Sequence, residues 1–288
     1  MKLGISSYSL YQAMRDGSMT IAEVIEWVAG IGASHIEIVP GLGFDFAANP
    51  ELEEQIREKA AAVGIGISNY AIGANFLTET EEQYEAEIAR VMSEVDRVHR
   101  LGVKLMRHDV ASRPDTSIAR FQEDLDRIAA ACQRIADHAK QYDITTSVEN
   151  HGYYVQASDR VQALIHAVDR PNFKTTLDVG NFVCVDENPV AAVKNNLPYA
   201  SMIHIKDFYI RPSYRNPGEG WFTSASGDYL RGAIAGHGDL DLYEILRLIK
   251  ASGYDGYMSI EYEGMEDCRQ GTKIAFDNVT RIWSEIHT

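Results

Sequence analysis

Four side chains that could bind a metal ion end short apolar runs of this sequence. They are Glu149 in T-S-V-E-N-H-G, Asp178 in T-T-L-D-V-G-N, His204 in S-M-I-H-I-K-D and Glu261 in M-S-I-E-Y. Each run is apolar enough to be a buried strand, and such polar groups are not buried without partners. Three carboxylates and one imidazole form a hard, mostly oxygen ligand set, which suits Mn²⁺ or Mg²⁺ and also accommodates Co²⁺ or Zn²⁺. The runs therefore predict a divalent metal site.

These runs belong to a longer alternation of strand and helix patterns. We expect strands at residues 2–7, 35–39, 65–70, 103–109, 144–149, 173–178, 200–206 and 257–261, and helices at 20–31, 50–63, 79–101, 117–142, 158–168, 189–196, 242–251 and 268–286. Eight such units predict an α/β fold, a closed parallel (β/α)₈ TIM barrel formed by a single domain over residues 1–288. An open doubly wound sheet also explains the alternation, but not the use of four separate strand ends for one polar site.

The composition limits the partners of the protein. The net charge is −15 and no basic run is present, so we expect binding to neither nucleic acid nor anionic lipid. There is no apolar run of membrane-spanning length and no secretory leader pattern. Three widely spaced cysteines predict no disulfide framework. We therefore expect a cytoplasmic protein with a small-molecule substrate.

The motifs around the four candidate ligands resemble those of a known family. V-E-N-H-G, L-D-V-G-N, I-H-I-K-D and S-I-E-Y-E-G are similar to motifs of the xylose-isomerase-like TIM barrels, and within these of the sugar phosphate isomerase/epimerase group. The resemblance covers nearly the whole chain. It implies a divalent ion, usually Mn²⁺, held by the four side chains. It also implies that Glu149 and Glu261 flank a carbohydrate substrate and exchange protons with it.

The expected chemistry agrees with this ligand set. Removing a proton α to a carbonyl creates an enediolate, whose charge a Lewis-acidic metal ion stabilises. The proton transfer needs a base on one face and an acid on the other, and Glu149 and Glu261 are the natural pair. We therefore predict a metal-dependent isomerase or epimerase that acts on a keto-sugar or related polyol. A lyase or dehydratase shares the first proton abstraction and is the alternative, as in inosose dehydration or elimination from a 3-oxo-glycoside.

Asn181 departs from the pattern of some relatives. Members with two or three metal ions, such as DNA-repair endonucleases, carry histidine at this position, and ketose 3-epimerases tend to do so as well. Asparagine is a poor ligand for a second metal but a good hydroxyl-binding amide. The change argues against a multinuclear site and a simple ketose epimerase, and together with the net charge of −15 against an endonuclease. The complete ligand set argues against a non-catalytic sugar-binding barrel.

Further polar side chains are expected to contact the substrate. They are Asn69, His108, His151, Asn181, Lys206 and His237. His151 and Lys206 each follow a candidate ligand by two residues, so they project to the same side of an extended backbone. His151 is equally compatible with holding a loop, and Lys206 with forming a salt bridge to Asp207.

Residues 207–240 are rich in glycine and aromatic side chains, and they are unusually long for a connection. We expect a long irregular loop over the active site, whose aromatic rings pack on apolar sugar faces and exclude water. Exposed aromatic residues also mark protein interfaces, so the same stretch is compatible with a contact between copies in a homo-oligomer.

Overall fold

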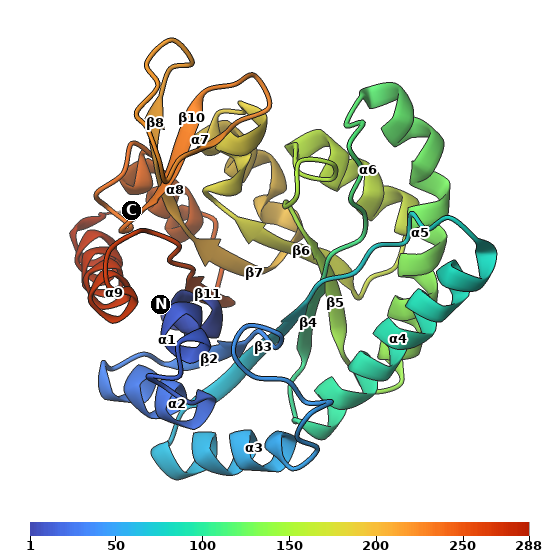
Figure 1. Ribbon diagram of the computed structural model, residues 1–288, viewed down its shortest axis with the longest axis horizontal. Helices are drawn as coiled ribbons and strands as arrows, with labels where there is room; N and C mark the ends of the chain where they lie inside the picture. The colour runs from blue at the N-terminus through green and yellow to red at the C-terminus, as the bar shows by residue number, and fades with distance from the viewer. Residues whose placement is uncertain (288) are drawn as a thin grey trace.

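Eight parallel strands close into a barrel in the computed structural model, which describes residues 1–287 (Figure 1). The strands are β1 (Lys2–Ser6), β2 (His35–Ile38), β3 (Gly66–Ile72), β4 (Leu105–His108), β5 (Thr145–Glu149), β6 (Phe173–Asp178), β7 (Ala200–Ile205) and β11 (Tyr257–Ile260). They pair in the order β1-β11-β7-β6-β5-β4-β3-β2, and β2 pairs in turn with β1. The expected (β/α)₈ barrel is confirmed.

Helices surround the barrel on its outside (Figure 1). They are α1 (Tyr11–Arg15), α2 (Ile21–Gly30), α3 (Leu52–Val63), α4 (Glu81–Arg100), α5 (Ile118–Lys140), α6 (Ser158–Val168), α7 (Pro189–Asn196), α8 (Leu242–Ala251) and α9 (Cys268–Glu285), with short 3₁₀ helices η1 (Ser7–Leu10), η2 (Asn181–Val185) and η3 (Leu197–Tyr199). Helix α2 begins with a capping box, in which Thr20 and Glu23 each accept a hydrogen bond from the other's backbone N–H. Its buried residues Val24, Ile25 and Val28 form the apolar stripe that packs on the barrel. Within residues 1–287, no helix has the length and apolarity needed to cross a bilayer.

The strands alternate between an apolar outer face and a polar inner face. The outer residues Ile36, Ile203 and Ile260 belong to the hydrophobic core between strands and helices. On the inner face, the register pairs His204 with Asp178 on one side and with Ser259 on the other. Because side chains of a strand point alternately to opposite faces, a shift of one residue decides whether a side chain reaches the barrel interior.

The segment after β7 is more regular than expected. Residues 207–240 contain β8 (Asp207–Arg211), β9 (Phe222–Thr223) and β10 (Tyr229–Ala233), which form an antiparallel sheet in the order β8-β10-β9. Strands β8 and β10 project away from the barrel (Figure 1). The expectation of an irregular loop was therefore wrong. The glycines that suggested it, Gly218, Gly220 and Gly227, lie in the turns between these strands, where they let the chain turn. Phe208 and Leu230 form a small apolar core under the sheet.

Candidate active site

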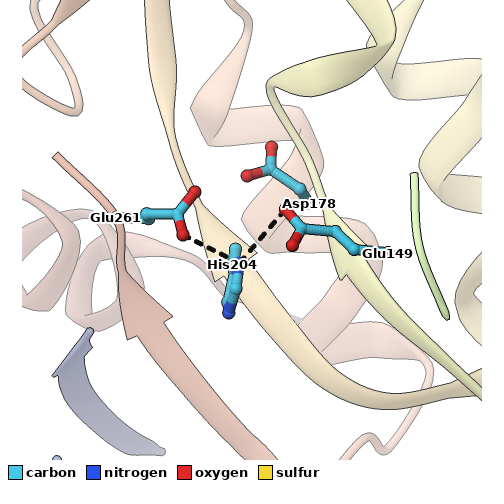
Figure 2. A group of neighbouring side chains, drawn as sticks. All are labelled: Glu149, Asp178, His204 and Glu261. Atoms are coloured by element: carbon cyan, nitrogen blue, oxygen red, sulfur yellow. Dashed lines mark ion pairs between the residues drawn. The ribbon is translucent and has the colours of Figure 1, made fainter. Parts of the chain in front are cut away.

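The four candidate ligands meet at the carboxyl ends of neighbouring strands. Glu149 ends β5, Asp178 ends β6, His204 lies near the end of β7 and Glu261 directly follows β11, which are consecutive in the barrel (Figure 2). All four side chains are buried, and one ligand atom from each lies within 4.8 Å of the others. Pairing of these adjacent strands thus brings together Glu149 and Glu261, which are 112 positions apart in the chain.

His204 is oriented by a carboxylate on the side away from the other ligands. Its Nε2 lies 2.9 Å from Glu37 Oε2, and Asn69 Nδ2 donates to Glu37 Oε1 at 2.8 Å. Its Nδ1 faces Glu149 Oε1 and Glu261 Oε1, each at 3.5 Å (Figure 2). A histidine that donates one ring N–H to a carboxylate presents its other nitrogen as the ligand. His204 therefore offers Nδ1 to the site.

Asp178 is held by hydrogen bonds that leave one oxygen available. Asn150 donates its side-chain amide to the Asp178 carbonyl and accepts the Asp178 backbone N–H, both at 2.8 Å. Asp178 Oδ1 accepts the backbone N–H groups of Gly180 at 2.7 Å and Asn181 at 2.8 Å. Within residues 1–287, the buried Asp178 Oδ2 makes no hydrogen bond. This oxygen is directed to the site, where Lys206 Nζ lies 3.4 Å away.

Two buried cations control the protonation of the two glutamates. Arg107 Nε lies 2.6 Å from Glu149 Oε2, and Lys206 Nζ lies 2.6 Å from Glu261 Oε2. Burial by itself would raise the pKa of both carboxyl groups. For Glu149 the Arg107 guanidinium and a protonated His204 outweigh burial and hold the pKa well below its usual range. His204 would give up this proton on binding a metal ion. For Glu261, Lys206 and His204 lower the pKa in the same way, so both groups are ionised at neutral pH.

The site opens into a cavity of about 260 Å³, which Glu149, His204 and Glu261 line. Its other walls are formed mainly by residues at the ends of strands and in the loops beyond them, among them Tyr8, Pro40, Ile72, Arg107, His151, Lys206 and Glu263. A cavity of this size is close to the lower end of small-molecule pockets, which span about 300–1,000 Å³. It suits a compact polar substrate that reaches the ligand cluster from above the strand ends.

The donor set fits a divalent cation. Besides Asp178 Oδ2, the buried His204 Nδ1 makes no hydrogen bond within the described part of the chain. Burial, together with the Glu261 and Glu149 carboxylates, raises the pKa of Asp178 to about 7, although Lys206 opposes the shift. The raised pKa of Asp178 reflects the negative charge of the neighbouring carboxylates, which a bound cation would offset. Hard oxygen donors with one imidazole are compatible with Mn²⁺, Mg²⁺, Co²⁺ or Zn²⁺.

The sequence matches the family model of the xylose isomerase-like TIM barrels over residues 25–281. The protein belongs to this family. The resemblance inferred from the motifs is confirmed.

Individual relatives are distant from this chain. An inosose dehydratase from Lacticaseibacillus casei is 25% identical over 197 residues, which cover 64% of this chain and 65% of the relative, slightly less than two thirds of its length. The zinc-bound IOLI protein has a TM-score of 0.79 at 16% identity, with 100% of both chains covered. A D-psicose 3-epimerase from Clostridium cellulolyticum H10, solved with D-tagatose, has a TM-score of 0.73 at 15% identity and coverage of 98% and 99%. At these identities the two structures establish the fold alone.

Three of the residues expected to contact the substrate lie at this site. His151 and Lys206 line the cavity. Asn181 donates to Glu149 Oε1 at 3.1 Å and accepts from Lys206 Nζ at 3.2 Å. The alternative of a salt bridge between Lys206 and Asp207 is wrong, because the Asp207 carboxylate accepts backbone N–H groups of residues 236–240 instead.

The other three expected contacts do not line this cavity. Asn69 is buried and reaches the site only through its hydrogen bond to Glu37. His108 lies on the outer face of β4, where its ring packs edge-on against Phe76 at a centroid distance of 5.9 Å. The expectation that His108 contacts the substrate is therefore corrected. The preceding residue, Arg107, points to the inner face of β4, so His108 points to the outer face. His237 is exposed, so the permissive loop that suggested it does not bring it to the cavity.

Three cavity residues were missed as candidates in the sequence. They are Tyr8, Arg107 and Glu263. Arg107 pairs in register with Ser147, which lies two residues before Glu149 on the inner face. Glu263 follows Glu261 by two residues. The two-residue periodicity that identified His151 and Lys206 would have found both.

Proposed function

We propose that this protein is a divalent-metal-dependent isomerase or epimerase that acts on a keto-sugar or related polyol by proton transfer at the carbon next to the carbonyl. The observation that carries this proposal is the placement of two ionised carboxylates. Glu149 and Glu261 each have an oxygen 3.5 Å from His204 Nδ1, and they approach it from different strands (Figure 2). We expect each of them to reach the substrate carbon from its own side of the cavity.

The metal would be held by Glu149, Asp178, His204 and Glu261, and we expect Mn²⁺. When bound, it would supply Lewis-acid stabilisation of the negative charge that forms on the substrate. Elemental analysis is the direct test of its identity, because the ligand set is compatible with several divalent ions.

The side chains of the site position the two carboxylates and transfer the proton. Arg107 and Asn181 hold Glu149 in place, and Lys206 holds Glu261, so both carboxylates are fixed before the substrate arrives. One carboxylate accepts the proton next to the carbonyl and, in an isomerisation, returns the same proton to the adjacent carbon. In an epimerisation the other carboxylate first takes up a proton from solvent and then delivers it to the opposite face. His151 and Lys206 line the cavity, and we expect them to bind substrate hydroxyl or carbonyl oxygens.

A dehydratase or other lyase is the second candidate, and Lys206 is the observation that favours it. Its ammonium lies beside Glu261 and could protonate a leaving hydroxyl group. The similarity to an inosose dehydratase points the same way. Burial lowers the pKa of Lys206, but Asp178 and Glu261 outweigh it and raise the pKa well above its usual range. With this raised pKa the Lys206 ammonium is a weak proton donor, so we rank the lyase below the isomerase or epimerase.

NMR in D₂O with the Mn²⁺-loaded protein and a panel of keto-sugars tests the proposal. An isomerase or epimerase incorporates deuterium next to the carbonyl and keeps the carbon skeleton, whereas a lyase releases water or an aglycone. Glu149→Gln and Glu261→Gln should keep part of the metal and each lose about 10²–10⁴-fold in turnover. The exposed Glu85→Gln is the control and should match the wild type. Full turnover in either active-site variant with metal bound would exclude that glutamate as a proton carrier.

A further inference from the structure

A second cavity adjoins the first one at the base of the antiparallel sheet. Its volume is about 180 Å³, and it shares His151, Lys206 and Glu263 with the first cavity. The remaining lining residues are Gly152, Tyr153, Gln156, Asn181, Cys184 and Phe222. Phe222 belongs to β9, so the sheet after β7 supplies one wall. The two cavities therefore lie side by side, and a ligand that occupied both would pass His151, Lys206 and Glu263.

Part of the wall of the second cavity is apolar and aromatic, since it is formed by Tyr153, Cys184 and Phe222. Phe222 is 38% exposed and packs edge-on against the buried Phe208 at a centroid distance of 5.8 Å. Burial raises the pKa of the Cys184 thiol to about 12, so this side chain is a neutral wall residue and not a nucleophile. Tyr153 packs against the same small apolar core as Phe208. These groups complement the flat apolar face of a ring.

The position of Tyr153 is held by its surroundings. Its φ angle is +65°, which is unfavourable for a residue with a side chain. Its hydroxyl donates to the Thr223 carbonyl of β9 at 2.7 Å, and its backbone N–H donates to Gln156 Oε1. Gln156 Nε2 in turn donates to the Asn181 carbonyl at 2.5 Å. The loop after β5 is therefore hydrogen-bonded both to β9 and to Asn181, which contacts the candidate ligand Glu149. Backbone strain of this kind is often retained at binding sites.

We propose that the second cavity binds a ring attached to the reacting sugar, so that the substrate is a glycoside of a keto-sugar. This inference rests on the proposed function. The first cavity alone, at about 260 Å³, is below the usual range of about 300–1,000 Å³, and the two together come within it. The reacting ring binds beside Glu149 and Glu261, and the aglycone ring packs between Tyr153 and Phe222.

The charges in the second cavity disfavour a sugar phosphate. Lys206 Nζ is already paired with Glu261 at 2.6 Å and Glu263 at 3.3 Å. His151 Nδ1 lies 3.3 Å from Asp109 Oδ1. A phosphate group would have to compete with these carboxylates for Lys206 and His151, at a cost that a neutral ring does not incur. The occupant that fits best is therefore uncharged and apolar on one face.

Three probes test this inference with the Mn²⁺-loaded protein. They are 3-oxo-glucose, its 4-nitrophenyl glycoside and 3-oxo-glucose 6-phosphate. We expect kcat/KM to be about tenfold higher for the glycoside than for 3-oxo-glucose, a ratio that corresponds to one aromatic stacking contact. Phe222→Ala should abolish most of this tenfold preference, and Phe222→Tyr should retain it. Tyr214→Ala is the matched control, because Tyr214 is 84% exposed on the same segment and lines neither cavity, and it should keep the preference.

The outcomes separate this inference from the proposed function. A preference that is unchanged within twofold in Phe222→Ala, or a wild-type preference for the phosphate, overturns the inference while leaving the proposed reaction intact. If no probe is turned over, calorimetry with the unreactive 4-nitrophenyl glucoside decides. A Kd about tenfold weaker in Phe222→Ala supports the ring site although the reaction has failed, and equal binding or none overturns it.

Discussion

Glu37 is expected to control metal affinity although it is not among the proposed ligands. Its carboxylate accepts from His204 Nε2 at 2.9 Å and from Asn69 Nδ2 at 2.8 Å, and both contacts are buried. Removing it by Glu37→Ala leaves the His204 ring without the acceptor that selects its tautomer and its orientation. We therefore predict that Glu37→Ala weakens Mn²⁺ binding, because His204 Nδ1 is no longer held toward the other ligands.

The size of the effect follows from the contacts that are lost. A hydrogen bond to a charged group contributes about 1.5–3 kcal/mol, and about 1.4 kcal/mol is a factor of ten in affinity. Glu37→Ala should therefore weaken metal binding by about 10–100-fold. Glu37→Gln should lose about tenfold or less. Its amide oxygen can still accept from His204, and its amide nitrogen can donate to Asn69 Oδ1, which makes no hydrogen bond in the described chain.

Calorimetric titration of Mn²⁺ in the presence of a competing chelator measures these affinities at neutral pH. Glu26→Gln is the control, because Glu26 lies on the neighbouring α2 with its side chain 63% exposed. Circular dichroism checks that each variant is folded. If folded Glu37→Ala bound Mn²⁺ as tightly as the control, the orientation of His204 would not depend on Glu37, and the proposed role of Glu37 would have to be abandoned.

Two further substitutions test other parts of the structure. Asp178→Asn removes a charged candidate ligand, so we expect the purified variant to contain little metal by elemental analysis, and one full equivalent would contradict its role. Asp207→Ala removes the buried acceptor of the Gly236 and Gly238 N–H groups, both at 2.9 Å. We expect its free energy of unfolding to fall by about 2–4 kcal/mol in denaturant titrations. A change below about 0.5 kcal/mol would show that these hydrogen bonds contribute little.

The barrel and the ligand cluster could be inferred from the sequence because both depend on local periodicity. Apolar residues that recur with helical or strand spacing predict the elements, and eight alternating units predict closure. Closure in turn places all strand ends on one rim. A polar residue that ends each of four apolar runs must then lie near the other three, which is how Glu149, Asp178, His204 and Glu261 were identified.

Only the tertiary structure decided what surrounds this cluster. Glu37 and His204 are 167 residues apart, and no local pattern links them. The inner face of β4 carries Arg107 and not His108, because the register with β5 and not the polarity of the residue determines which side chain points inward. The glycine-rich stretch after β7 became a sheet whose Phe222 lines a second cavity. Strand register, barrel closure and packing between distant segments set these contacts, and none of these is contained in the spacing of residues along a single element.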